Sequence, residues 1–152
     1  MSLVRKMLIV AIPPTVLFIL LAGLRLVAEA LYLPRPIPRL FSVSLAVILS
    51  SVYVGLIAHR RGVDRAWGVV PTMVIISLVA QVVIVSMQGV LASVLGTPSQ
   101  FNGLTDRPEG QHILLHLLFI GLFMGLLLSI PALIIHLIVR RDDQAGGQRH
   151  KS

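Results

Sequence analysis

The sequence predicts an all-α polytopic integral membrane protein, a four-transmembrane-helix bundle with its N- and C-termini in the cytoplasm. Hydrophobic residues make up 56% of the 152 residues and charged residues only 12%, whereas soluble domains are about 45–50% apolar. Crossing roughly 30 Å of hydrocarbon takes about 20 residues of apolar helix. Four runs meet this length and are the predicted spans: residues 7–33, 40–58, 69–95 and 113–139.

Basic residues lie mainly at the run ends that face one side of the membrane. With the N-terminus placed inside, the inner residues are Arg5, Lys6, Arg60, Arg61, Arg65, Arg140, Arg141, Arg149 and Lys151. The outer residues are Arg35, Arg39 and Arg107. Because Lys and Arg are enriched in cytoplasmic loops, this asymmetry predicts cytoplasmic termini and a multi-pass location in the inner membrane. The charge of +7 therefore orients the spans, and no nucleic-acid partner is expected.

The chain is expected to form one transmembrane domain, residues 1–139, followed by a disordered basic cytoplasmic tail, residues 140–152. The tail is charged, contains glycine and has no apolar periodicity. The outer connection, residues 33–39, carries three prolines and is predicted to be extended. A cleaved secretory signal over residues 1–30 is the alternative to a retained first span, because residues 28–30 imitate a small-x-small cleavage site.

Small residues recur at helical spacing in the third and fourth runs. Gly121, Gly125 and Ser129 fall on one side of the fourth run, and Gly89 and Ser93 are spaced alike in the third. This spacing lets helix backbones approach closely in lipid. Because no catalytic arrangement accompanies it, the protein is not expected to be an enzyme. The predicted function is helix association, as a homo-oligomer or as a subunit of a larger membrane complex, with the bilayer and copies of itself or other membrane subunits as partners.

Polar residues from three runs are expected to meet in the outer third of the bundle. This outer cluster consists of Arg25, Glu29, Gln88, His112 and His116. Arg25 and Glu29 are four residues apart, so they share a helix face and are expected to form an ion pair. His112 and His116 have the same spacing. We expect hydrogen bonds and the ion pair to hold this cluster together.

No cofactor is predicted, but two sets of side chains support a membrane redox protein as an alternative. Glu29, His112 and His116 offer one oxygen and two imidazole ligands for a metal ion. His59 and His136 end the second and fourth runs at similar depth and suit axial ligation of a haem. The chain has no cysteine, which excludes thiolate ligands and a cysteine nucleophile.

A polar stripe on the third run supports a further alternative, a small proton- or ion-coupled transporter or channel. Ser77, Gln81 and Gln88 lie within about 40° of one another around a helix. In this alternative the stripe lines a path, Glu29 accepts the proton, and Arg25 is its switchable partner. Uncharged glutamines in a bilayer also form hydrogen bonds between helices, so the stripe also agrees with the predicted function in helix association.

Overall fold

The computed structural model of the chain describes residues 2–34, 36–63, 65–95 and 114–149, and these are helical with no strand among them. The elements are α1 (Leu3–Ala30), α2 (Pro36–Leu40), α3 (Val43–Ile57), α4 (Ala66–Leu95), the π-helical turn η1 (His116–Ile120) and α6 (Gly121–Arg149). The predicted all-α bundle is confirmed.

Among the described residues, three segments are long and apolar enough to cross a membrane: Leu3–Ala30, Ala66–Val90 and Leu117–Asp142. The fourth, α3, is apolar but has only 15 residues, which at about 1.5 Å per residue is close to 22 Å. It is therefore shorter than the hydrocarbon layer, and the turns at its ends complete the length of the bundle.

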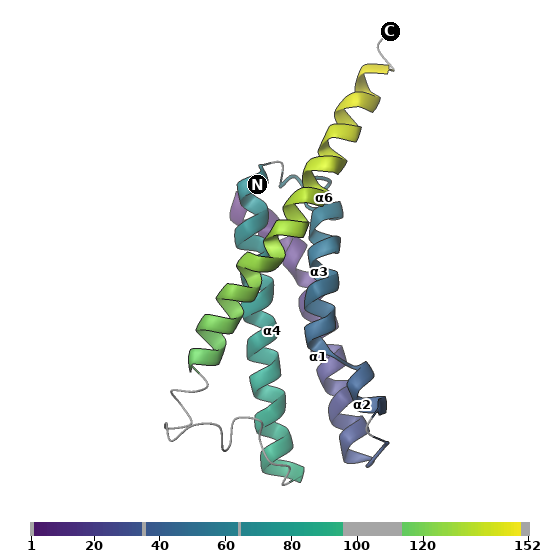
Figure 1. The fold of residues 1–152 in the computed structure, drawn as a ribbon, viewed down its shortest axis with the longest axis vertical. Helices are drawn as coiled ribbons and strands as arrows, with labels where there is room; N and C mark the ends of the chain where they lie inside the picture. Colours follow the sequence, from purple (N-terminus) through teal and green to yellow (C-terminus); the bar gives the residue numbers. More distant parts are fainter. Residues whose placement is uncertain (1, 35, 64, 96–113, 150–152) are drawn as a thin grey trace.

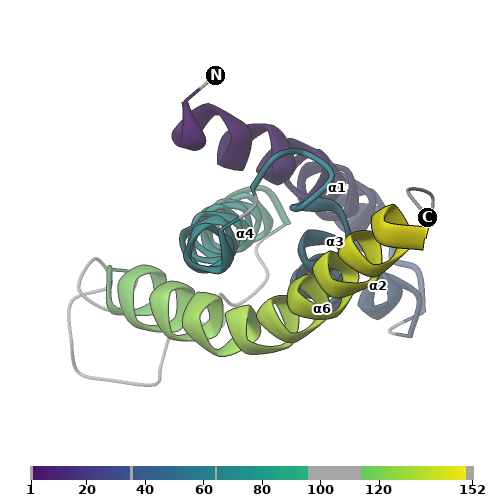
Figure 2. The same cartoon turned by 90° about the horizontal axis from the view of Figure 1, so that it is seen from above.

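The four long elements form a closed arrangement in which α4 packs between α1 and α6, and α3 packs against α6, α4 and α1. Seen from above, α6 runs along the side opposite α1 (Figure 2). The N-terminus and the far end of α6 lie at the same end of the molecule (Figure 1). The short connections from α1 through α2 to α3 and from α3 to α4 return each helix beside the one before it.

Local hydrogen bonds explain where the helices begin and end. Ser2 and Ser42 precede α1 and α3, and their hydroxyl oxygens accept from the N–H of Arg5 and Leu45. Such caps satisfy N–H groups that the first turn leaves without a partner. After α3, Val63 N–H donates to Ala58 C=O while Gly62, at φ +79°, bonds His59 C=O, which is a Schellman ending.

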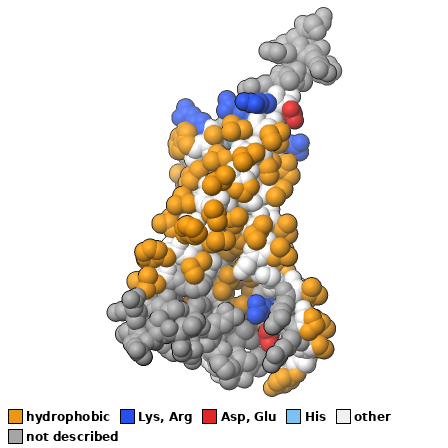
Figure 3. Space-filling view, in the orientation of Figure 1, with side chains coloured by type: hydrophobic (Ala, Val, Ile, Leu, Met, Phe, Trp, Pro, Cys, Tyr) orange, Lys and Arg blue, Asp and Glu red, His pale blue; other side chains and the backbone are white. Residues whose placement is uncertain are grey.

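The core is built from inward-facing aliphatic and aromatic side chains, and the outer faces are apolar as well. The largest fully buried hydrophobic side chains include Val10, Phe18, Val54, Met73 and Ile76. The space-filling view shows hydrophobic side chains along the length of the bundle, with most of the visible Lys and Arg at one end and a basic side chain beside an acidic one near the other end (Figure 3). An apolar exterior with basic ends is typical of a helical protein in a bilayer.

Two expected segments differ from the structure. The connection of residues 33–39, expected to be extended, is helical from Pro36 onward, where it forms most of the short helix α2. Pro36 occupies the first position of α2, where a missing N–H costs nothing. The helix α6 continues to Arg149, past residue 140, where a disordered tail was expected to begin. The last described part of the chain thus extends as helix beyond the bundle (Figure 1).

Candidate functional site

The glycines of α6 are covered by α4 of the same chain. A Cβ added at Gly125 would lie 2.7 Å from Val74 Cα, and one at Gly121 would lie 2.9 Å from Leu78 Cδ2. Ser129 is buried beside them and its hydroxyl donates to Leu126 C=O. The close approach predicted for these small residues therefore occurs inside the bundle.

Gly55 joins α3 to α6 in the same way. A Cβ there would lie 2.9 Å from Ala132 C=O and 2.6 Å from Ile135 Cβ. The contacts of α6 with α4 and with α3 thus both occur at glycines, where a side chain would prevent the close approach. The packing leaves these glycines unavailable to another protein.

Two other glycines are open. Gly23 on α1 and Gly89 on α4 would meet nothing within 4 Å of an added Cβ. Gly23 lines a cavity of about 350 Å³ between α1 and α4, which we call the α1/α4 groove. Gly89 precedes the lining residue Val90 on α4 but does not itself line the groove. Its lining residues are Ile19, Ala22, Gly23, Leu26, Val82, Val83, Ser86, Met87 and Val90.

The α4 side of this groove carries a stripe of exposed residues. Val82, Ser86, Gly89 and Ser93 are all exposed and are spaced four, three and four apart. This is the spacing of a helix seam that meets another helix at a shallow crossing angle. Gly89 and Ser93 were predicted as packing residues, whereas Gly23 and Ser86 were not singled out, although both are small residues in apolar runs.

The Arg25–Glu29 pair predicted from the sequence is present. Arg25 Nε lies 3.7 Å from Glu29 Oε1, and both side chains are partly exposed. Gln88, expected in the same outer cluster, is buried on α4. His112 and the side chain of His116 lie outside the described residues, so the assembly of the outer cluster and its metal site stay predictions.

The polar stripe of α4 faces the interior. Ser77, Gln81 and Gln88 are buried. Within the described segments, Ser77 Oγ and Gln81 Oε1 have no hydrogen-bond partner. Gln81 lies beside α6, since its Cγ would be 3.3 Å from a Cβ at Gly121. The stripe is therefore buried in the bundle, with Gln81 against α6, and its use as a path stays a prediction.

His59 and His136 are brought together. Their ring centroids are 6.0 Å apart with an interplanar angle of 79°, an edge-to-face contact, and His136 is 0% exposed. The contact joins the turn after α3 to α6. No group of three or more His, Asp or Glu side chains in the described segments is placed to hold a metal ion, and the haem reading stays a prediction.

A lysine connects the start of α1 to the turn after α3. Lys6 Nζ donates to Gly62 C=O at 2.9 Å. Gly62 needs its left-handed conformation here, and an added Cβ would lie 2.7 Å from Lys6 Nζ. This bond fixes the basic end of the bundle, where both termini lie.

Comparisons of the chain with protein-family models, with curated proteins and with solved structures found no match.

Proposed function

We propose that this protein works by association in the membrane, and that the α1/α4 groove receives a transmembrane helix of a neighbouring subunit or of a second copy. We place it in the inner membrane with both termini in the cytoplasm. The position of both termini at one end (Figure 1) and the gathering of Lys and Arg there (Figure 3) support this orientation.

The observation that carries the proposal is the difference between two sets of glycines. Gly55, Gly121 and Gly125 are covered by backbone or side chains within the chain, whereas Gly23 and Gly89 are open. In lipid, helices associate through close packing at small residues rather than through hydrophobic burial. Gly23 and Ser86 stand on the two walls of the α1/α4 groove, and Gly89 is exposed on α4 one turn after Ser86. These small residues are therefore the feature that a partner helix would use.

The shape of the groove supports a helix as its occupant. The exposed positions 82, 86, 89 and 93 follow one line along α4, and Ala22 and Gly23 stand on the facing wall of the groove. The side chains of a partner helix packed along this line would fit into the space that the small residues Ser86 and Gly89 leave. The described lining residues carry no charge, so the partner surface is expected to be apolar.

The test is the Ser86→Leu variant, which places a bulky side chain on the seam. Ser44→Leu is the matched control, because Ser44 is also exposed but lies on α3. We expect the particles of wild type and Ser44→Leu, extracted in mild detergent, to contain a protein mass greater than one 16.5 kDa chain after the bound detergent is subtracted, and those of Ser86→Leu to contain a single chain. Native mass spectrometry would identify the lost mass as a second copy or another subunit. An unchanged particle in Ser86→Leu would contradict the proposal.

A further inference from the structure

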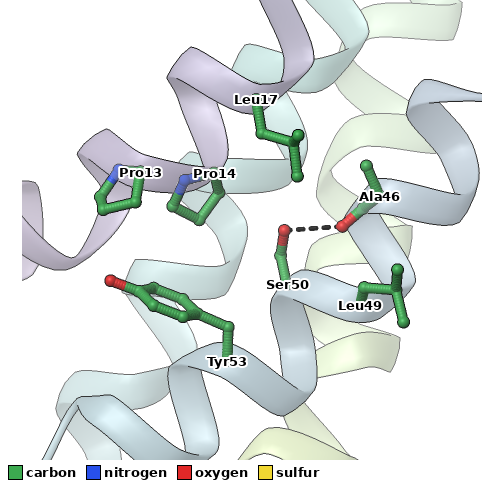
Figure 4. A pocket seen from close by; sticks show the side chains of 7 residues that line it. All are labelled: Pro13, Pro14, Leu17, Ala46, Leu49, Ser50 and Tyr53. Atoms are coloured by element: carbon green, nitrogen blue, oxygen red, sulfur yellow. Dashed lines mark hydrogen bonds between the residues drawn. The ribbon is translucent and has the colours of Figure 1, made fainter. Parts of the chain in front are cut away.

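A second cavity, of about 180 Å³, opens between α1 and α3, on a different helix pair from the α1/α4 groove (Figure 4). Its lining residues are Pro13, Pro14, Leu17, Ala46, Leu49, Ser50 and Tyr53. We call it the α1/α3 cavity. Its shape arises from short side chains, because the proline rings and Ala46 leave space that longer residues would fill.

The walls of this cavity are flat and largely apolar. Pro13 and Pro14 form the α1 wall, and the Tyr53 ring lies across from them (Figure 4). At the mouth, Leu17 and Leu49 are 42% and 57% exposed. A ligand would therefore enter from the bilayer, between two leucines, and meet a slot bounded by rings.

Two hydroxyl groups give the cavity its polarity. Ser50 is 4% exposed, and its hydroxyl donates to Ala46 C=O at 2.7 Å (Figure 4), so its hydrogen is already used. Tyr53 has no hydrogen bond to any described residue, which leaves its hydroxyl able to donate. Because no charged side chain lines the cavity, a charged head group would lose its hydration without compensation.

We propose that the α1/α3 cavity binds the ring of a neutral, membrane-soluble molecule whose carbonyl oxygen accepts a hydrogen bond from Tyr53, the chemistry of a quinone with an apolar tail. The size agrees, since an apolar cavity of about 150 Å³ holds one benzene ring. The ring lies between the prolines and Tyr53, and the tail leaves past Leu17 and Leu49 into the bilayer.

The experiment measures binding of 2-decyl-1,4-benzoquinone to the full-length protein in detergent micelles by equilibrium dialysis. Tyr53→Phe removes only the hydroxyl, and Tyr32→Phe is the matched control because Tyr32 is 88% exposed at the end of α1. We expect one quinone per chain and about three- to tenfold weaker binding in Tyr53→Phe, the effect of losing one neutral hydrogen bond. Tyr32→Phe should bind as wild type does.

Two further ligands test whether binding depends on the hydrogen bond to Tyr53 or only on partition of an apolar molecule into the cavity. Decylbenzene has the ring and tail without oxygen, so it should bind more weakly than the quinone, and equally to wild type and Tyr53→Phe. Dioctanoylglycerol carries ester carbonyls without a ring and should not displace the quinone at equal concentration. The proposal is overturned if Tyr53→Phe binds the quinone like wild type, if decylbenzene binds as tightly as the quinone, or if dioctanoylglycerol displaces it.

Discussion

Gly125 is the position where α6 comes closest to the backbone of α4. A side chain there would meet Val74 Cα at 2.7 Å and Met73 C=O at 3.3 Å, and backbone atoms cannot turn aside as a flexible side chain can. Gly89 is exposed on α4, and a Cβ added there would meet nothing within 4 Å. The two glycines share a residue type but have opposite environments.

The Gly125→Ala variant is expected to lower the stability of the bundle by about 1–3 kcal/mol, because one added carbon must force α4 and α6 apart. Gly89→Ala is the control and should leave stability unchanged or raise it by up to about 1 kcal/mol, since alanine favours helix. Thermal unfolding of both variants in the same detergent measures the difference. Equal effects of the two substitutions would contradict the α4/α6 contact.

Which glycine is covered could not be predicted from the sequence. Gly121 and Gly125 were identified as packing residues from their spacing, but the spacing does not say whether the approaching helix belongs to the same chain. In a bilayer both the interior and the exterior of a bundle are apolar, so the helices carry little amphipathic signal that marks their inner face. The covered and the open glycines look alike until the helices are placed.

At the scale of elements, the helices followed from apolar run length, and their ends followed from turn chemistry. The predicted spans 7–33 and 69–95 match α1 and α4 to within a few residues. Gly62, at φ 79°, is the left-handed residue that ends the turn after α3. The helix α2 was missed because Pro36 and Pro38 lie in its first turn, where proline is tolerated.

The end of α1 repeats the Schellman ending without a glycine. Leu33 N–H donates to Ala28 C=O and Tyr32 N–H to Glu29 C=O, with Tyr32 at φ 51°. A left-handed backbone places the Cβ of an L-residue close to its own carbonyl. The left-handed conformation of Tyr32 therefore costs free energy that a glycine at this position would not cost.

The Tyr32→Gly variant is accordingly expected to stabilise the bundle by about 1 kcal/mol. Tyr32 is 88% exposed, so the loss of its side chain removes little packing. Thermal unfolding of Tyr32→Gly beside Tyr32→Phe separates the two effects, because phenylalanine keeps the strained conformation. A lower melting temperature for Tyr32→Gly than for Tyr32→Phe would show that α1 does not end in this way.

At the scale of the whole molecule, the described part of the chain closes its close contacts at glycine internally and leaves the α1/α4 groove open. α6 is held by α4 at Gly121 and Gly125 and by α3 at Gly55, so these faces are occupied. The α1/α4 groove has no such cover. The ion pair of Arg25 and Glu29 lies at the end of the stretch of α1 that lines the groove, with Arg25 next to the lining residue Leu26 and Glu29 about one turn further along.

Much of the candidate site could not be predicted, because it depends on how helices that are distant in the sequence pack together. The pairing of Arg25 with Glu29 is local and followed from a spacing of four residues. The groove needs α1 and α4 to lie adjacent, as they do in Figure 2, although their sequences are separated by α2 and α3. The meeting of His59 and His136 likewise required the turn after α3 to fold back on α6.

The most direct measurement uses the absence of cysteine from the chain. A benzophenone-maleimide is attached to the cysteine of Ser86→Cys and, as the control, of Ser44→Cys. Each labelled protein is irradiated in native membranes, and the masses of the crosslinked products are measured by mass spectrometry. Binding of a helix in the α1/α4 groove predicts one protein adduct of defined mass from position 86, none from position 44, and loss of the adduct when Gly23→Leu fills the opposite wall. Adducts formed equally from both positions, or an adduct from position 86 that persists with Gly23→Leu, would contradict it.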